Sequence, residues 1–286
     1  MTMRALRRYI TLYETWAPAH QENRRRLAML HAPAVMPVRS ETQGRRPTGE
    51  DKDVCQLPET VLLARGARVV LTKNQGRGKL TCYGLNNGAI GTLIAVLYKQ
   101  GEGPTAEPAT GRVVGFPEAV VVDFPHYSGP AWDPAHPTWV PVPVNEGFDR
   151  LKGHGRKGLP LRLGYATVVH KAQGMSIGDG KPIERLRLCL ANSVNMEASN
   201  LGLLYVALSR VEKFMHLVLV DAVDQRRVLY VNQHPSMPGR HAEERRLQAL
   251  SAATVAAALE RDLDYAALLR EHVCWMRRRP AAVAAY

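Results

Sequence analysis

The spacing of apolar residues changes twice along this chain. Near the N-terminus, "YITLY" (9–13) is typical of a strand. In "HQENRRRLAML" (20–30), Leu27, Met29 and Leu30 fall near one helical face and Arg24 to Arg26 point toward solvent, which predicts a helix. Residues 38–53 are polar and contain Pro and Gly, so we expect a linker or surface loop there.

Short β-type runs dominate the next hundred residues. Strands are expected over 66–74, 88–99, 118–124 and 138–144, and clusters rich in Gly and Pro separate them. Asn87 and Gly88 in "LNNGAIG" predict a tight turn between two of these strands. Several short strands at this spacing favour a small barrel.

Strand and helix patterns alternate after residue 147. "LRLGYATVVH" (161–170), "IERLRLCLA" (183–191) and "MHLVLVDA" (215–222) predict strands, and "GLLYVALSRVE" (202–212) predicts a helix, so an α/β layer is expected. Residues 238–279 predict a helical tail that packs on the domain through one apolar face. That face would hold Val255, Leu259, Leu263, Ala266 and Val273.

The charge of the chain favours a polyanionic partner. Lys and Arg number 38 against 26 acids, for a net charge of +12, and counterion release favours nucleic acid binding by such a protein. A solvated basic surface is the alternative. No uninterrupted apolar run is long enough to span a membrane, and no membrane partner is expected. The four cysteines form no CxxC pair and the histidines no HExxH, so no metal site is expected.

Two segments of the α/β layer carry a specific resemblance. "VVHKAQGMS" (168–176), followed about thirty residues later by "YVALSRV" (205–211), resembles the last two motor motifs of PIF-type, RecD-like, superfamily-one DNA helicases. "LLARGARVVLTKN" (62–74) and "GLNNGAIGTL" (84–93) resemble the start of the insertion in the second motor domain of these helicases, and "AVVVDFPHYSGPAW" (119–132) and "WVPVPV" (139–144) resemble its later strands. The likeness covers about residues 55–220 in the order of the family and extends to "HQENRRRL" (20–27) before them.

The resemblance implies an α/β fold, with a RecA-like second motor lobe of the P-loop NTPase type, an inserted small β-barrel and a helical C-terminal tail. Residues 1–54 would form the N-terminal part of the motor lobe plus a linker, and 55–146 the barrel with the strand that leads into it. Residues 147–225 would form the RecA-like lobe with the last two motifs, and 226–286 the helical tail.

The resemblance also implies a nucleotide site. Arg210 would be the arginine finger that neutralises charge on the γ-phosphate in the transition state, and Gln173 and Gly174 would contact the nucleotide. The alternative for Arg210 is a surface salt bridge. ATP and Mg²⁺ are the cofactors expected of the family, with the Mg²⁺ ligands absent from this chain.

The same resemblance implies contacts with single-stranded DNA. The candidates are Thr167, His170, Lys171, Lys73, Asn87, Lys152 and Lys157. His170 could instead be a buried histidine with its hydrogen bonds satisfied, and the lysines and Asn87 could belong to the barrel rim. Val168 stands where family members usually have a DNA-binding Thr, and Thr167 cannot simply replace it because adjacent side chains of a strand face opposite ways. The basic segment "RLKGHGRKG" (150–158) is expected to be a phosphate-tracking loop or a disordered surface loop. Tyr83 and Tyr127 could stack on bases or belong to the barrel core or rim.

The sequence contains no GxxxxGK[ST] loop and no Asp-Glu pair, the elements that cradle phosphate and hold magnesium in these helicases. We therefore expect the C-terminal half of an ATP-dependent DNA helicase, which couples ATP hydrolysis to translocation on single-stranded DNA and unwinding in repair, recombination and telomere maintenance. Alone it should be inactive, and a further chain or segment would supply the first motor lobe. The alternatives are a non-catalytic single-strand-binding module and a truncated gene product. The expected location is the nucleus or mitochondrion in a eukaryote, and otherwise the cytoplasm.

Overall fold

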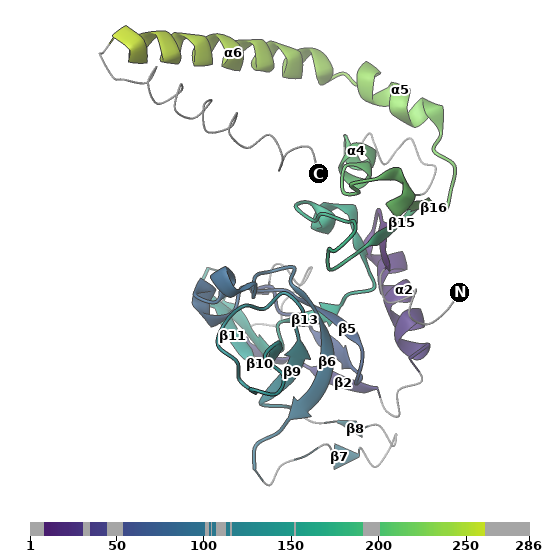
Figure 1. Cartoon of the computed structure of the whole chain (residues 1–286), viewed down its shortest axis with the longest axis vertical. Coiled ribbons are helices and arrows are strands. Elements are labelled where there is room, and N and C mark those ends of the chain that lie inside the picture. Colours follow the sequence, from purple (N-terminus) through teal and green to yellow (C-terminus); the bar gives the residue numbers. More distant parts are fainter. Residues whose placement is uncertain are drawn as a thin grey trace.

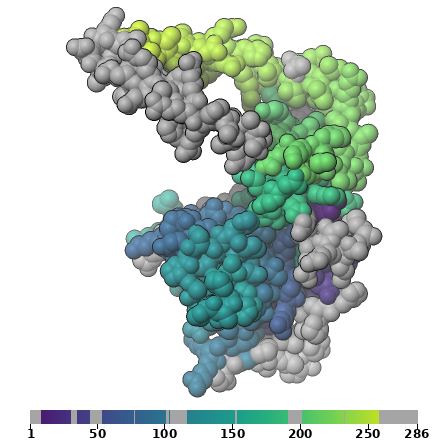
Figure 2. Space-filling model, viewed as in Figure 1, coloured from purple at the N-terminus to yellow at the C-terminus, as the bar shows by residue number. Residues whose placement is uncertain are grey.

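The computed structural model describes residues 9–30, 35–44, 54–100, 103, 105–106, 113–114, 116–151, 153–190 and 201–260. They form an α/β lobe (9–30, 165–190 and 201–224), a β insertion (35–164) and a helical arm (225–260) (Figure 1). The insertion is a rounded blue and teal body below the green lobe, and the arm extends away from both (Figure 2).

The α/β lobe is built on a four-stranded parallel sheet in the order β14-β1-β15-β16. Its strands are β1 (Tyr9–Tyr13), β14 (Ala166–Val168), β15 (Arg185–Cys189) and β16 (Leu217–Leu219). β1 lies inside the sheet and its three central residues are buried, as expected for a parallel strand covered on both faces. The helices are α2 (Trp16–Ala28) and α4 (Leu203–Leu208), with the short 3₁₀ helices η4 (Val169–Ala172) and η5 (Phe214–His216).

The β insertion centres on a five-stranded antiparallel sheet in the order β10-β9-β6-β5-β13. Its strands are β5 (Arg68–Leu71), β6 (Ile90–Leu97), β9 (Ala119–Asp123), β10 (Trp139–Pro143) and β13 (Leu161–Leu163). Three smaller sheets accompany it: β2 (Met36–Arg39) with β4 (Thr60–Leu63), β11 (Asn145–Asp149) with β12 (His154–Gly158) and β3 (Glu41–Gly44), and β7 (Thr105–Ala106) with β8 (Val113–Val114). Two 3₁₀ turns, η2 (Gly76–Gly78) and η3 (Thr81–Tyr83), connect β5 to β6.

A closed barrel is not confirmed. Among the described strands, backbone pairing leaves β10 and β13 as the edges of the five-stranded sheet. The sheet instead shares one apolar core with the β2–β4 pair, to which Val38, Val61, Val69, Val122 and Leu161 contribute. The four strands predicted between residues 66 and 144 are confirmed as β5, β6, β9 and β10.

Two predicted loops are wrong. Residues 38–53 were expected to be irregular, but part of β2 and all of β3 lie there, while 45–53 fall outside the described residues. The basic segment 150–158 was expected to be a loop, yet His154–Gly158 forms β12 between β11 and β3. Glycine permits this close pairing, because a Cβ on Gly155 would lie 2.6 Å from the carbonyl oxygen of Gly147. In both segments pairing with distant strands overrides a loop-like composition.

The helical arm consists of α5 (Gln225–Gln233) and α6 (Met237–Glu260). A buried ion pair anchors α5 to the lobe, with Arg227 Nη1 2.7 Å from Glu14 Oε1 and both side chains less than a tenth exposed. The prediction that the tail packs on the domain is wrong for the part that can be seen, because residues 238–257 of α6 are all exposed. Its Ala-, Glu- and Arg-rich sequence favours a helix without tertiary support. Leu263, Ala266 and Val273 lie outside the described residues.

Residues 161–170 were predicted as one strand but divide between the two bodies. β13 pairs antiparallel with β5 in the insertion, and β14 pairs parallel with β1 in the lobe. Asn23 of α2 holds the crossover between them. Its side-chain Oδ1 accepts hydrogen bonds from the backbone N–H groups of Tyr165 (3.0 Å) and Ala166 (2.9 Å), and its Nδ2 donates to Ala166 O (2.8 Å).

We expect Asn23→Ala to lower the free energy of unfolding by about 2–4 kcal/mol, because two backbone N–H groups and one carbonyl lose their partner in a buried place. Chemical denaturation measures this change. Gln21→Ala, an exposed position of the same helix, is the matched control and should change stability by less than about 0.5 kcal/mol. Equal stability of the two variants would show that the crossover does not depend on Asn23.

Candidate nucleic-acid interface

A cavity of about 470 Å³ lies between the α/β lobe and the β insertion. The lobe contributes the first turns of α2, part of β14 and the segment that follows β14. The insertion contributes β4, β5, β13 and the turn before β6. Three fixed cations line it, Arg24, Arg162 and Lys171, and no carboxylate is among the described residues of its wall. The cavity therefore suits an anionic ligand that carries apolar surface.

The structure brings three of the predicted DNA-binding residues to this cavity. Thr167 of β14, Lys171 of η4 and Asn87 of the turn before β6 all line it. The predicted tight turn is present, with Gly88 at φ +98° and its N–H bonded to Leu71 O. His170 lies next to Lys171 and is exposed, so the alternative of a buried histidine is wrong. Val168 is buried and its side chain is not part of the wall.

Other candidates lie elsewhere. Lys157 sits in β12, where its Nζ is 3.2 Å from Glu41 Oε2 and 5.2 Å from the centre of the Phe116 ring. Lys73 follows β5 beside Gly147 and does not line the cavity. Lys152 lies outside the described residues.

The two tyrosines considered for base stacking also lie away from the cavity wall. Tyr83 and Tyr127 pack against each other, edge to face, with ring centres 6.5 Å apart. The Tyr127 hydroxyl donates to Pro130 O at 3.0 Å. Both contacts join residues of the insertion to each other.

Four aromatic or basic residues of the cavity wall were not among the predicted site residues: Trp16, His20, Arg24 and Arg162. The available signal was the i, i+4 spacing of Trp16 and His20, which places both on one face of α2. Arg162 carried no comparable signal, because it reaches the cavity only through the pairing of β13 with β5.

The predicted nucleotide residues meet in a second place, at the end of α4. The Arg210 guanidinium donates to Val206 O (3.0 Å), Ser209 Oγ (2.9 Å) and Met175 O (3.4 Å). Its backbone carbonyl accepts from Ile177 N at 2.9 Å. These contacts hold the segment 175–177 against the arginine. Gln173 and Gly174 are exposed beside it, and the φ of +87° at Gly174 is one that glycine adopts without strain.

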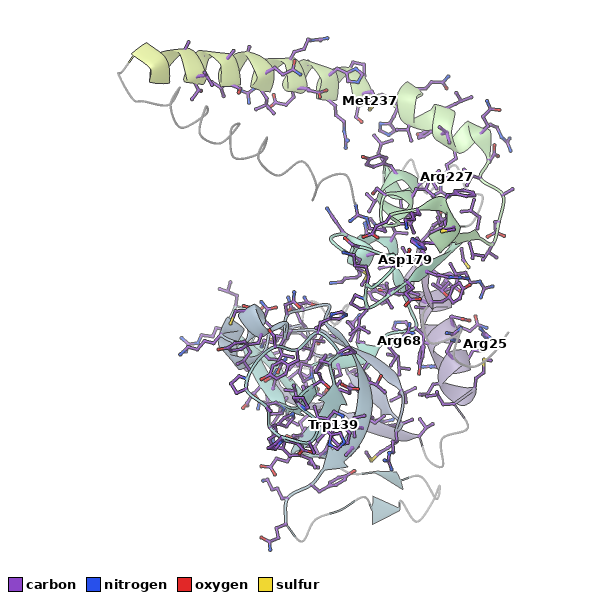
Figure 3. The ribbon with its side chains drawn as sticks, viewed as in Figure 1. Arg25, Arg68, Trp139, Asp179, Arg227 and Met237 are labelled. Atoms are coloured by element: carbon purple, nitrogen blue, oxygen red, sulfur yellow. The ribbon has the colours of Figure 1, made fainter. Side chains whose placement is uncertain are left out.

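A polar bridge extends this contact. Asp179 binds Lys213 Nζ at 3.1 Å and the Nε2 atom of buried His216 at 3.2 Å, and Figure 3 shows Asp179 within the lobe. The hydrogen bond from Lys213, followed by that from His216, lowers the pKa of the Asp179 carboxyl below its ordinary value. The carboxylate is therefore charged at neutral pH, and the bridge weakens as the pH falls through this lowered pKa. Within the described part of the chain, no group of three or more His, Cys, Asp and Glu residues could hold a metal ion, and no helix is both long and apolar enough to cross a membrane.

We expect Asp179→Asn to speed hydrogen exchange at the backbone amides of Ile177 and Glu212, which pair with Arg210 O and Ile177 O. Asparagine keeps the shape of the side chain but removes the charge that holds Lys213 and His216. Mass spectrometry of exchange measures this, with Glu243→Gln in the exposed Glu243–Arg246 pair of α6 as the control. Unchanged exchange at both amides would show that the bridge does not support the Arg210 contact.

Comparison with known proteins places these two sites in context. No family model matches the chain. Over 172 residues it is 30% identical to the ATP-dependent DNA helicase PIF1 of Xenopus laevis, an alignment that covers 58% of this chain and 20% of the relative. The chain therefore spans about a fifth of the curated relative that it matches.

Among solved structures, 79% of the chain matches 45% of a Pif1 helicase studied for DNA unwinding at forked double-stranded DNA by two coordinating Pif1 helicases, with a TM-score of 0.52 and 16% identity. Pif1 from Bacteroides in complex with ADP-AlF3 and single-stranded DNA matches 77% of this chain and 41% of its own, with a TM-score of 0.49 and 16% identity. The resemblance found in the motifs is thus confirmed: this chain is similar to one part of a PIF1-type helicase, and its α/β lobe has the RecA-like motor fold.

Proposed function

We propose that this chain is the C-terminal motor half of an ATP-dependent DNA helicase, which couples ATP hydrolysis to movement along single-stranded DNA. It would grip the strand in the cavity and present Arg210 to a nucleotide held by another lobe. The observation that carries the proposal is the meeting of Lys171 and Thr167 from the lobe with Asn87 from the insertion in one cationic cavity.

The charge of the cavity supports a nucleic acid strand as its ligand. Arg24, Arg162 and Lys171 supply positive charge to a wall whose described residues include no Asp or Glu, so a phosphate entering there releases counterions. The Thr167 hydroxyl and the Asn87 amide add neutral hydrogen-bond donors. Phosphate and sugar contacts of this kind hold a strand without reading its sequence, as a protein that moves along DNA requires.

The surroundings of Arg210 support a role toward a nucleotide. Its guanidinium binds two carbonyl oxygens and one hydroxyl, all neutral, and no carboxylate in the described structure pairs with it. The surface-salt-bridge alternative is therefore not favoured. A rigid guanidinium whose charge is not neutralised is suited to stabilise charge that develops on a transferring phosphoryl group.

We further propose that the phosphates and Mg²⁺ are held by a separate lobe, because the chain contains no GxxxxGK[ST] loop. The surface near Arg210 supports such a partner. Tyr205 of α4 and Phe214 and Met215 of η5 are 75%, 82% and 72% exposed, an unusual degree for large apolar side chains. We propose that they pack against the lobe that holds the nucleotide.

Lys171→Ala should weaken binding to a single-stranded oligonucleotide and reduce the slope of log K against log salt by about 0.7, the value for one lost phosphate contact. Fluorescence anisotropy titrations at several salt concentrations measure both. Lys99→Ala removes an exposed lysine outside the cavity and is the charge-matched control. If both variants lost the same affinity, the cavity would not be the DNA site.

The purified chain should hydrolyse ATP at the rate of the blank, with or without single-stranded DNA, because nothing in its sequence cradles the phosphates. A coupled phosphate-release assay measures this. Robust, DNA-stimulated hydrolysis that Arg210→Ala abolishes would contradict the need for a second lobe. Binding to single strands with no turnover, even when a first motor lobe of a related helicase is supplied, would favour the alternative of a non-catalytic binding module.

A further inference from the structure

We propose that the cavity also holds an unpaired nucleobase against Trp16, so that the strand is gripped by a base as well as by its phosphates. This inference rests on the proposed binding of single-stranded DNA and assigns Trp16 as the residue that selects an unstacked base. Base stacking would make the affinity for the strand depend less on salt concentration than phosphate contacts alone would.

The geometry around Trp16 carries the inference. The indole is half-buried at the start of α2 and forms part of the cavity wall. Arg162 of β13 places its Cζ 4.9 Å from the centre of the ring. The His20 imidazole is stacked with it, at 5.4 Å between centres and 23° between planes. All three planar groups line the cavity, one contributed by the insertion and two by the lobe.

Planar π groups of this kind are the usual platform for bases in single-strand binding. Every base has a π face, so stacking tolerates any sequence, and an arginine plane adds a cation–π contribution. A wall meant only to attract phosphate would need no indole. The lysine and arginines of the wall supply the charge, and the stacked group of His20, Trp16 and Arg162 supplies a planar surface that a phosphate cannot use.

The rest of the cavity has the size and chemistry for a base. A volume of about 470 Å³ lies within the roughly 300–1,000 Å³ typical of small-molecule sites. Ile10, Leu62, Val70 and Leu163 give it an apolar interior. Polar groups that suit sugar and phosphate, on Thr167, Lys171 and Asn87, belong to the same wall. A base in a duplex is stacked between its neighbours, so only an unpaired base can enter.

The test compares two strands of equal length and charge, an oligothymidylate and the same backbone with consecutive abasic residues. The wild-type chain should bind the abasic strand about 5- to 150-fold more weakly, the range for loss of one stacked base. Trp16→Ala should bind the oligothymidylate correspondingly more weakly, with an unchanged salt slope, and its preference for the base-bearing strand should shrink by the same factor. Trp16→Phe, which keeps an aromatic face, should retain most of that preference.

Trp132→Ala removes a tryptophan that is 53% exposed on the insertion and outside the cavity, and should leave both affinities unchanged. Thermal melting checks that each variant folds. If Trp16→Ala does not fold, the wild-type comparison of the two strands and the Trp16→Phe variant decide. Equal binding of both strands by the wild type, or a base preference that survives Trp16→Ala, would overturn this inference while leaving salt-dependent strand binding intact. Failure to bind either strand would instead overturn the proposed function, and this inference with it.

Discussion

The arrangement of the two bodies depends on the capture of one backbone crossover by the Asn23 side chain. Its amide satisfies both N–H groups and one carbonyl at Tyr165–Ala166, where the chain leaves the insertion and enters the parallel sheet. Arg68 ties the same point from the insertion side, donating to Tyr9 O at 2.6 Å and lying 5.5 Å from the centre of the Tyr165 ring (Figure 3). Because the cavity lies between the bodies, these contacts set the distance between its walls.

One short segment joins the two candidate sites. Lys171 and Met175 both line the cavity, and the carbonyl of Met175 accepts a hydrogen bond from Arg210. The bridge between Ile177 and Val211 continues this contact along the backbone. A shift of Arg210 toward a phosphate would therefore displace Met175 and the segment that leads to Lys171, which we propose contacts the strand. Under the proposed function this continuous set of contacts would couple the two sites, and the Asp179 ion pairs with Lys213 and His216 lie beside it.

The insertion and the lobe each have a main apolar core, and a third apolar cluster joins them, in which Leu27 of α2 packs with Ala64 and Ala67. Polar and cation–π contacts cross the junction as well, such as Arg68 with Tyr9 and Arg162 with Trp16. Contacts of this kind fix orientation but contribute less stability than a continuous core. The cavity that we propose as the strand site lies at this junction, so a bound strand would contact both bodies.

The sequence by itself determined the elements whose signal is local. Alternating apolar residues predicted β5, β6, β9 and β10, and the motif around residues 168–176 predicted a RecA-like motor lobe. Only the tertiary structure showed that the chain passes from the insertion to the lobe at Gly164. It also showed that β10 and β13 are edge strands and that residues 238–257 of α6 are exposed. The motifs predicted Thr167, Lys171 and Asn87 as site residues. Trp16 and Arg162 were identified only from their positions in the cavity wall. The physical reason is that periodicity reports which face of an element is buried, while a cavity wall is assembled by pairing between strands far apart in the chain.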